Sequence, residues 1–87
     1  MHMKSSVRLE ITWDGEKEAT AAKTALEGPE FKGERTQSRV VQNGSKVLIS
    51  IEAKDSIALR ALLNSYLRHI QIMENLEEKQ RRMENDG

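Results

Sequence analysis

An Asn-Gly pair between two strand-like runs is the feature that most constrains how this chain can fold. Residues 35–42 (RTQSRVVQ) and 45–53 (SKVLISIEA) flank Asn43-Gly44. This dipeptide is the strongest short signal for a two-residue hairpin turn, because both central positions take positive φ. Such a turn predicts the following register: Gln42 opposite Ser45, Val40 opposite Val47, Arg39 opposite Leu48, Ser38 opposite Ile49, Thr36 opposite Ile51, and Arg35 opposite Glu52.

The segment before the hairpin predicts one more strand and a helix. Residues 7–13 (VRLEITW) alternate apolar and polar side chains, as in a half-buried strand with one wet face. Asp14 is the expected cap of a helix over residues 16–27, which is rich in alanine and ends at Gly28-Pro29. Alanine buries little area, but it allows another helix to approach closely.

A long helix is predicted from about residue 56 to residue 80 or beyond, with Asp55 as its cap. The order strand, helix, strand, strand, helix favours an α+β fold, in which a three-stranded antiparallel sheet carries both helices on one face. We expect the first strand to pair with the third. The 87 residues form a single domain, with a core over about 4–76 and a charged, fraying helical tail over 77–87.

The long helix is apolar around more of its circumference than one sheet can cover. A helix on a sheet needs a stripe roughly 100° wide. At about 100° per residue, bulky side chains assigned to the sheet fill one arc: Leu59, Leu63, Tyr66, Leu67 and Ile70. A second arc mixes apolar, small and polar residues: Ala58, Ala61, Leu62, Ser65, His69, Ile72, Met73 and Leu76. Two explanations of this broad apolar arc stay open: packing in the protein's own core alone, or contact with a binding partner.

The composition gives no sign of catalysis. Lys plus Arg and Asp plus Glu each number 14, so the chain lacks the net positive charge of a dedicated nucleic-acid binder. There is no cysteine, and the two histidines have no companions that suggest a triad or a metal site. We predict a protein that is not an enzyme, that needs no cofactor and that binds no metal.

No run approaches the ~18 apolar residues of a membrane span, so we expect no membrane contact and a cytoplasmic location.

Two groups of residues on the long helix resemble a known family. Ala58-Leu59-Arg60, followed by Asn64-Ser65-Tyr66-Leu67-Arg68, is similar to a motif of the small dimerising subunit of the KEOPS (EKC) complex, in its archaeal form. The acidic residue Asp55 before the motif, the pair Pro29-Glu30 after the first helix, and the order of elements over residues 4–76 also fit that family. His69 is a departure, because the family often has tryptophan there.

The resemblance implies a non-catalytic scaffold. Similar proteins form homodimers and lay their two helices against helices of the ATP-binding threonylcarbamoyl-transferase subunit. The whole complex modifies the adenosine beside the anticodon of certain tRNAs with a threonylcarbamoyl group, and the small subunit helps to hold tRNA. The alternative is a small KH-like RNA-binding module that acts on its own, although the Gly-x-x-Gly loop of KH domains is missing.

The residues predicted to receive the transferase subunit come from both helices: Ala21, Ala25, Leu62, Ser65, His69, Ile72 and Met73. Accessory contact with tRNA phosphates is predicted for Arg60 and Arg68, which share a polar strip with Asn64 and Gln71. We also predict a homodimer. The outer face of the sheet is too polar to pack dry against a copy, which favours pairing of strand edges.

Overall fold

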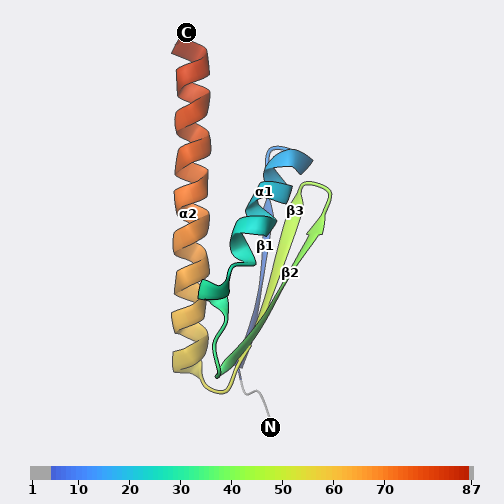
Figure 1. The fold of residues 1–87 in the computed structure, drawn as a ribbon, viewed down its shortest axis with the longest axis vertical. Helices are drawn as coiled ribbons and strands as arrows, with labels where there is room; N and C mark the ends of the chain where they lie inside the picture. The colour runs from blue at the N-terminus through green and yellow to red at the C-terminus, as the bar shows by residue number, and fades with distance from the viewer. Residues whose placement is uncertain (1–4, 87) are drawn as a thin grey trace.

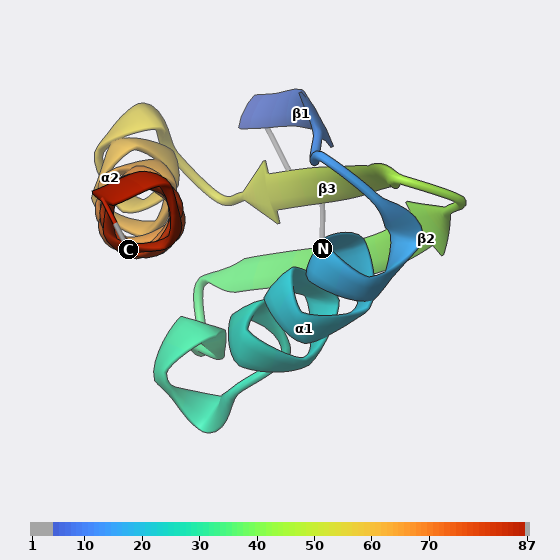
Figure 2. The ribbon, with the colours of Figure 1, turned by 90° about the horizontal axis from the view of Figure 1, so that it is seen from above.

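The computed structural model describes the backbone of residues 5–86 and the side chains of residues 5–75. The elements follow one another as β1 (Ser5–Thr12), α1 (Glu16–Leu26), a 3-10 turn η1 (Pro29–Phe31), β2 (Thr36–Asn43), β3 (Lys46–Ala53) and α2 (Ser56–Asp86). The strands form one antiparallel sheet in the order β1-β3-β2, and both helices lie on the same side of it (Figures 1 and 2). The predicted α+β fold and the pairing of the first strand with the third are confirmed.

The register predicted for the hairpin is wrong by two residues. Asn43 pairs with Lys46, so the turn residues are Gly44 and Ser45 rather than Asn43 and Gly44. Gly44 has φ 62°, and no other described residue has positive φ. A turn with positive φ only at its first central position is of type II′, which places glycine first, whereas the predicted type I′ turn needs positive φ at both positions. A shift of two keeps every side chain on its predicted face.

The shift changes which charged residues face each other. Arg39 lies opposite Ser50 and not opposite Leu48. Arg35 lies before β2 instead of opposite Glu52, and its guanidinium is 3.8 Å from the carboxylate of Asp55.

The inner face of the sheet supplies the centre of the core. Val47, Ile49 and Ile51 of β3 are fully buried, because β3 is the middle strand and both helices cover it. Ala19, Ala22 and Leu26 pack from α1 over β2 and β3. Leu62, Tyr66 and Ile70 pack from α2 over β3 and β1.

The predicted orientation of α2 requires a correction. Leu62 was assigned to the arc away from the sheet, but it is 9% exposed and belongs to the core. Leu67 was assigned to the sheet, but it is 45% exposed. The helix is therefore rotated so that the line through Leu62, Tyr66 and Ile70 faces the sheet.

One of the two predicted helix caps is present. The backbone N–H of Ala58 donates to the Asp55 carboxylate at 2.8 Å, as expected for a cap of α2. At α1, the N-cap residue is Gly15 instead of Asp14, and it makes no side-chain capping bond. Helix α1 begins at Glu16 as predicted, and its N-cap position is one residue later than expected.

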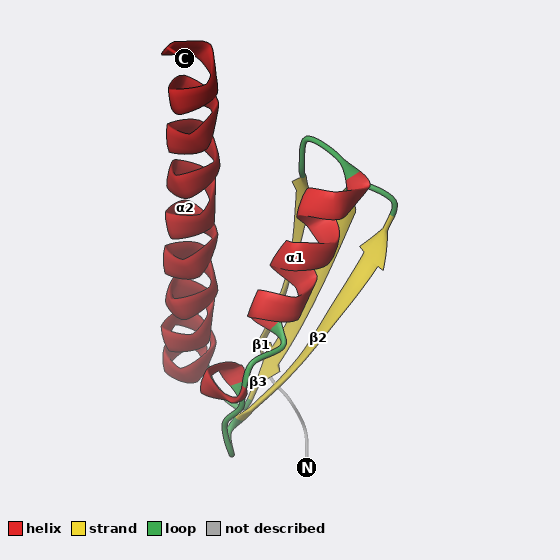
Figure 3. Ribbon diagram, turned by 45° about the horizontal axis from the view of Figure 1, so that its top comes forward, coloured by secondary structure: helices red, strands yellow, loops and turns green. Residues whose placement is uncertain are grey.

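Helix α2 is much longer than the sheet that it covers. Its 31 residues reach Asp86, and its last turns run past the ends of the strands (Figures 1 and 3). The side chains of the predicted charged tail, residues 77–87, lie outside the described part of the chain.

Candidate partner-binding surface

One side of α2 remains open to solvent, next to the side chains of this helix that face the sheet. We call Ala58, Ala61, Ser65, His69 and Ile72 the outer flank of α2. Ala61 and Ile72 are exposed, with Ile72 at 51%, while the other three are half-buried. At about 100° per residue, Ile72 lies about 80° around the helix from buried Leu62. The outer flank is thus a strip of small and apolar side chains that borders the core.

Three aromatic rings hold the outer flank against the rest of the molecule. Phe31 of η1 stacks on Tyr66, with ring centroids 4.3 Å apart and an interplanar angle of 5°. The ring of His69 meets Phe31 edge-on at 4.8 Å. Nδ1 of His69 lies 2.9 Å from the backbone oxygen of Ser65. Because a carbonyl oxygen only accepts, Nδ1 carries the proton of this bond, and the orientation of the ring is fixed from two sides.

Tyr66 links the same cluster to the sheet. Its hydroxyl donates to Oγ of Ser38 on β2 at 2.7 Å. Burial raises the pKa of Tyr66 above its ordinary value of 10.0, and the hydrogen bond with Ser38 acts in the opposite direction. The phenol is therefore neutral at physiological pH, and its hydrogen bond connects α2 to β2.

Helix α1 presents alanines beside this region. Ala21 and Ala25 are both exposed. Thr20, on another side of α1, hydrogen-bonds with Gln42 of β2 at 2.9 Å. Ala21 and Ala25 lie about 100° and 140° around the helix from Thr20, so they are turned away from the β2 edge. A helix of another protein can approach α1 closely at these small side chains.

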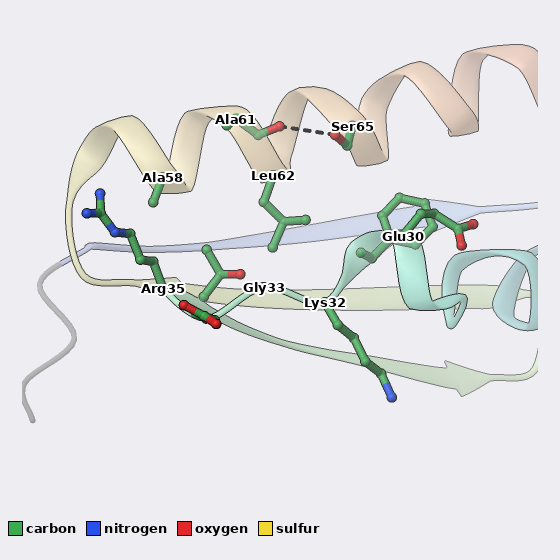
Figure 4. Close-up of a pocket in the computed structure, with 11 residues that line it drawn as sticks. Glu30, Lys32, Gly33, Arg35, Ala58, Ala61, Leu62 and Ser65 are labelled. Atoms are coloured by element: carbon green, nitrogen blue, oxygen red, sulfur yellow. Dashed lines mark hydrogen bonds between the residues drawn. The ribbon is translucent and has the colours of Figure 1, made fainter.

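A groove of about 470 Å³ adjoins the outer flank at the first turns of α2. It lies between α2 and the segment that joins η1 to β2, as Figure 4 shows. Leu62 points into it from α2, and Phe31 lines it from η1. Charged side chains from residues 30–35 form its rim, among them Glu30, Lys32 and Arg35. Its apolar floor and charged rim are typical of a surface that takes a protein segment rather than of an enclosed ligand site.

The polar strip of α2 faces away from the sheet, as predicted. Arg60, Asn64, Arg68 and Gln71 are all exposed. Within the part of the chain whose side chains are described, neither arginine takes part in an ion pair. The two guanidinium groups are thus available to solvent.

Two features are absent from the described residues, a candidate metal site and a candidate membrane span. Among them, no three His, Asp or Glu side chains gather closely enough to hold a metal ion. No described helix combines the length and apolar character that crossing a membrane requires.

Comparison with known families decides what kind of chain this is. The model of the family described as transcription factor Pcc1 matches residues 6–76. The chain belongs to the Pcc1 family. The predicted resemblance to the small KEOPS subunit is thereby confirmed.

Solved structures agree with this fold. The chain is similar to a chain in the crystal structure of a binary Gon7-Pcc1 complex, with a TM-score of 0.77 and 20% identity. The match covers 88% of this chain and 96% of the other. No curated protein matched the chain.

In this Pcc1 family member, the predicted partner-binding residues lie on α1 and α2 and differ in their solvent exposure. Ala21, Ala25 and Ile72 are open to solvent, and Ser65 and His69 are half-buried. The remaining two, Leu62 and Met73, pack in or against the protein's own core, so they have little surface left for a partner.

Phe31 is the residue of this surface that the sequence reasoning missed. It is the only phenylalanine in a chain with 3% aromatic residues, and it follows the pair Pro29-Glu30 directly. A single phenylalanine two residues after a proline in a predicted loop was a usable signal, because phenylalanine side chains are usually buried.

Proposed function

We propose that this chain is a non-catalytic scaffold and dimerisation subunit of the KEOPS complex, the assembly that makes threonylcarbamoyl-adenosine beside the anticodon of tRNA. In this role it binds the threonylcarbamoyl-transferase subunit through α1 and the outer flank of α2. The observation that carries the proposal is the solvent exposure of the outer flank, which ends at Ile72 with 51% of that side chain exposed, in a member of the Pcc1 family.

The geometry supports two helices of the partner packing against two helices of this chain. The outer flank offers small and apolar side chains along α2, and Ala21 and Ala25 permit close approach along α1. The aromatic contact of His69 with Phe31 holds the strip in place, so little order has to be gained on binding. Arg60 and Arg68, on the polar strip, are then free for an accessory contact with tRNA.

A single added charge tests this surface. Ile72→Glu should leave the fold intact, because the side chain is half exposed, and should weaken capture of the transferase subunit more than tenfold. An unpaired charge in a helix interface costs several kcal/mol, and about 1.4 kcal/mol is tenfold in affinity. Gln71→Glu is the matched control, since it adds the same charge one residue away on the polar strip.

The measurement is a pull-down of the purified transferase subunit by the wild type and both variants, with circular dichroism and a thermal melt of each. Full capture by Ile72→Glu would remove the outer flank from the interface. Equal loss in both variants would point to a general charge effect instead of a specific surface.

A further inference from the structure

His69 presents one nitrogen of its ring to solvent on the outer flank. Its Nδ1 donates to the backbone oxygen of Ser65 at 2.9 Å, so Nε2 of the neutral ring carries no hydrogen and is an acceptor. The ring makes no other hydrogen bond with the residues that the structure describes. Among the described residues that are not exposed, Nε1 of Trp13 is the one side-chain nitrogen or oxygen that is both fully enclosed and without a partner. Nε2 of His69 therefore reaches solvent, although the residue is half-buried.

Packing fixes the direction of this acceptor. Phe31 meets the His69 ring edge-on, with ring centroids 4.8 Å apart, and Phe31 is itself stacked on buried Tyr66. A half-turn of the His69 ring would replace Nδ1 by a carbon atom and would lose the hydrogen bond to Ser65. Nε2 is thus held in one place before any partner arrives.

The surroundings of His69 provide no fixed counter-ion. The four side chains one helical turn away on α2 are uncharged at neutral pH: Ser65, Tyr66, Ile72 and Met73. The charged groups on the neighbouring elements are Glu30 and Lys32 around η1, and Lys23 and Glu27 in the second half of α1. Lys23 and Glu27 pair with each other at 3.0 Å. Within the described side chains, His69 takes part in no ion pair.

We propose that the transferase subunit places a hydrogen-bond donor, an N–H or O–H group, opposite Nε2 of His69, and that protonation of Nε2 weakens the contact. The inference rests on the proposed function, in which that subunit covers the outer flank. A buried acceptor that has no donor costs free energy, so a partner that packs tightly here has to supply one.

The same arrangement makes binding sensitive to pH. Histidine is the side chain that ordinarily changes its charge between about pH 5 and pH 8. Protonation turns Nε2 from an acceptor into a charged donor, so two donors then face each other and the interface encloses an unpaired charge. His69 thereby selects the chemistry of the partner and lowers its affinity in acid.

Calorimetric titration of the purified transferase subunit with the full chain tests the proposal. The Kd should rise about tenfold from about pH 7.5 to about pH 5.5, because only chains with a neutral His69 bind. At about pH 6.5, binding should also release part of a proton from His69. This release is measured as a dependence of the binding heat on the ionisation enthalpy of the buffer.

Three variants isolate the acceptor. His69→Gln has an amide oxygen that can accept in place of Nε2 and that does not titrate, so it should bind like the wild type at about pH 7.5 and lose the pH dependence. His69→Phe keeps a ring without the acceptor and should bind about tenfold more weakly at both pH values, because the donor of the partner stays unpaired. His2→Gln removes the only other histidine and should keep the pH dependence of the wild type. Circular dichroism at both pH values checks that each variant is folded.

A measurement on the free chain does not depend on the partner. Long-range proton–nitrogen NMR spectra at about pH 8 should show the proton of His69 on Nδ1, and a proton on Nε2 would overturn the proposal. So would a pH dependence that survives unchanged in His69→Gln, or an affinity that rises in acid, which would place a carboxylate opposite the ring. Absence of binding at every pH would overturn the proposed function and this inference with it, whereas binding without the His69 effect would overturn this inference alone.

Discussion

Tyr66 connects three elements of the fold. Its ring packs on Phe31 of η1, its hydroxyl reaches Ser38 of β2, and its backbone belongs to α2. The sequence reasoning placed Tyr66 on the sheet side of α2 correctly, because helical periodicity separates bulky from polar positions. It could not fix the exact rotation of the helix, since apolar residues fill more than half of the circumference, and so it exchanged Leu62 with Leu67.

The ionisation of Tyr66 gives a prediction with a definite sign. Because burial raises its pKa above 10.0 in the folded state, the folded protein holds the phenol proton more tightly than the unfolded chain. The free energy of unfolding should therefore be unaffected by this group below pH 10 and should fall as the pH rises through the folded-state pKa. Ser38→Ala should raise the pKa further, since it removes the hydrogen bond that lowers it.

Ultraviolet titration measures this directly, because Tyr66 is the only tyrosine of the chain. Ser38→Ala serves as the internal comparison with the wild type. A folded-state pKa at or below 10.0, or a lower pKa in Ser38→Ala, would contradict the burial of the phenol.

At the level of elements, the hairpin illustrates what a local pattern can and cannot specify. The strand-like runs on either side of Asn43-Gly44 identified β2 and β3, and the side-chain period of two identified the face of each residue. The turn type was not determined by Asn43-Gly44 alone, since Gly44-Ser45 is an equally acceptable pair for a type II′ turn.

Gly44 should tolerate no ordinary side chain without loss of stability. Its φ of 62° lies in the left-handed region, and nothing lies within 4 Å of an added Cβ, so the cost of Gly44→Ala is purely conformational. We expect Gly44→Ala to lower the free energy of unfolding by about 1 to 2 kcal/mol, and Gly44→Asn to lower it by less. Urea denaturation of both variants checks this, and equal stability of Gly44→Ala and the wild type would rule out the observed turn.

The cap of α2 gives a second prediction at this scale. Asp55→Ala should destabilise the protein by about 1 kcal/mol, because the N–H of Ala58 loses its acceptor. Asp55→Asn is the control, since it keeps an acceptor oxygen and loses only the weak 3.8 Å pair with Arg35. In thermal melts, the melting temperature of Asp55→Asn should be close to that of the wild type. A loss as large in Asp55→Asn as in Asp55→Ala would mean that charge, not capping, is the important property.

For the whole molecule, the prediction is a homodimer joined through strand edges. The sheet ends at β1 and β2, and both edges can accept another strand. Light scattering should give twice the monomer mass of 9.9 kDa at micromolar concentration. Leu48→Lys, in the middle of the open face, should leave the dimer intact. A monomer in the wild type would contradict dimerisation, and dissociation by Leu48→Lys would show that the open faces pack together.

The central claim is that α1 and the outer flank of α2 form the surface for the transferase subunit, and hydrogen exchange tests it most directly. Amide exchange is compared in the chain alone and in the presence of the purified transferase subunit. We predict new protection in α1 and in residues 58–75 of α2, with exchange in β1 and β2 unchanged. Protection confined to the strands, with both helices exchanging as they do in the free chain, would contradict it.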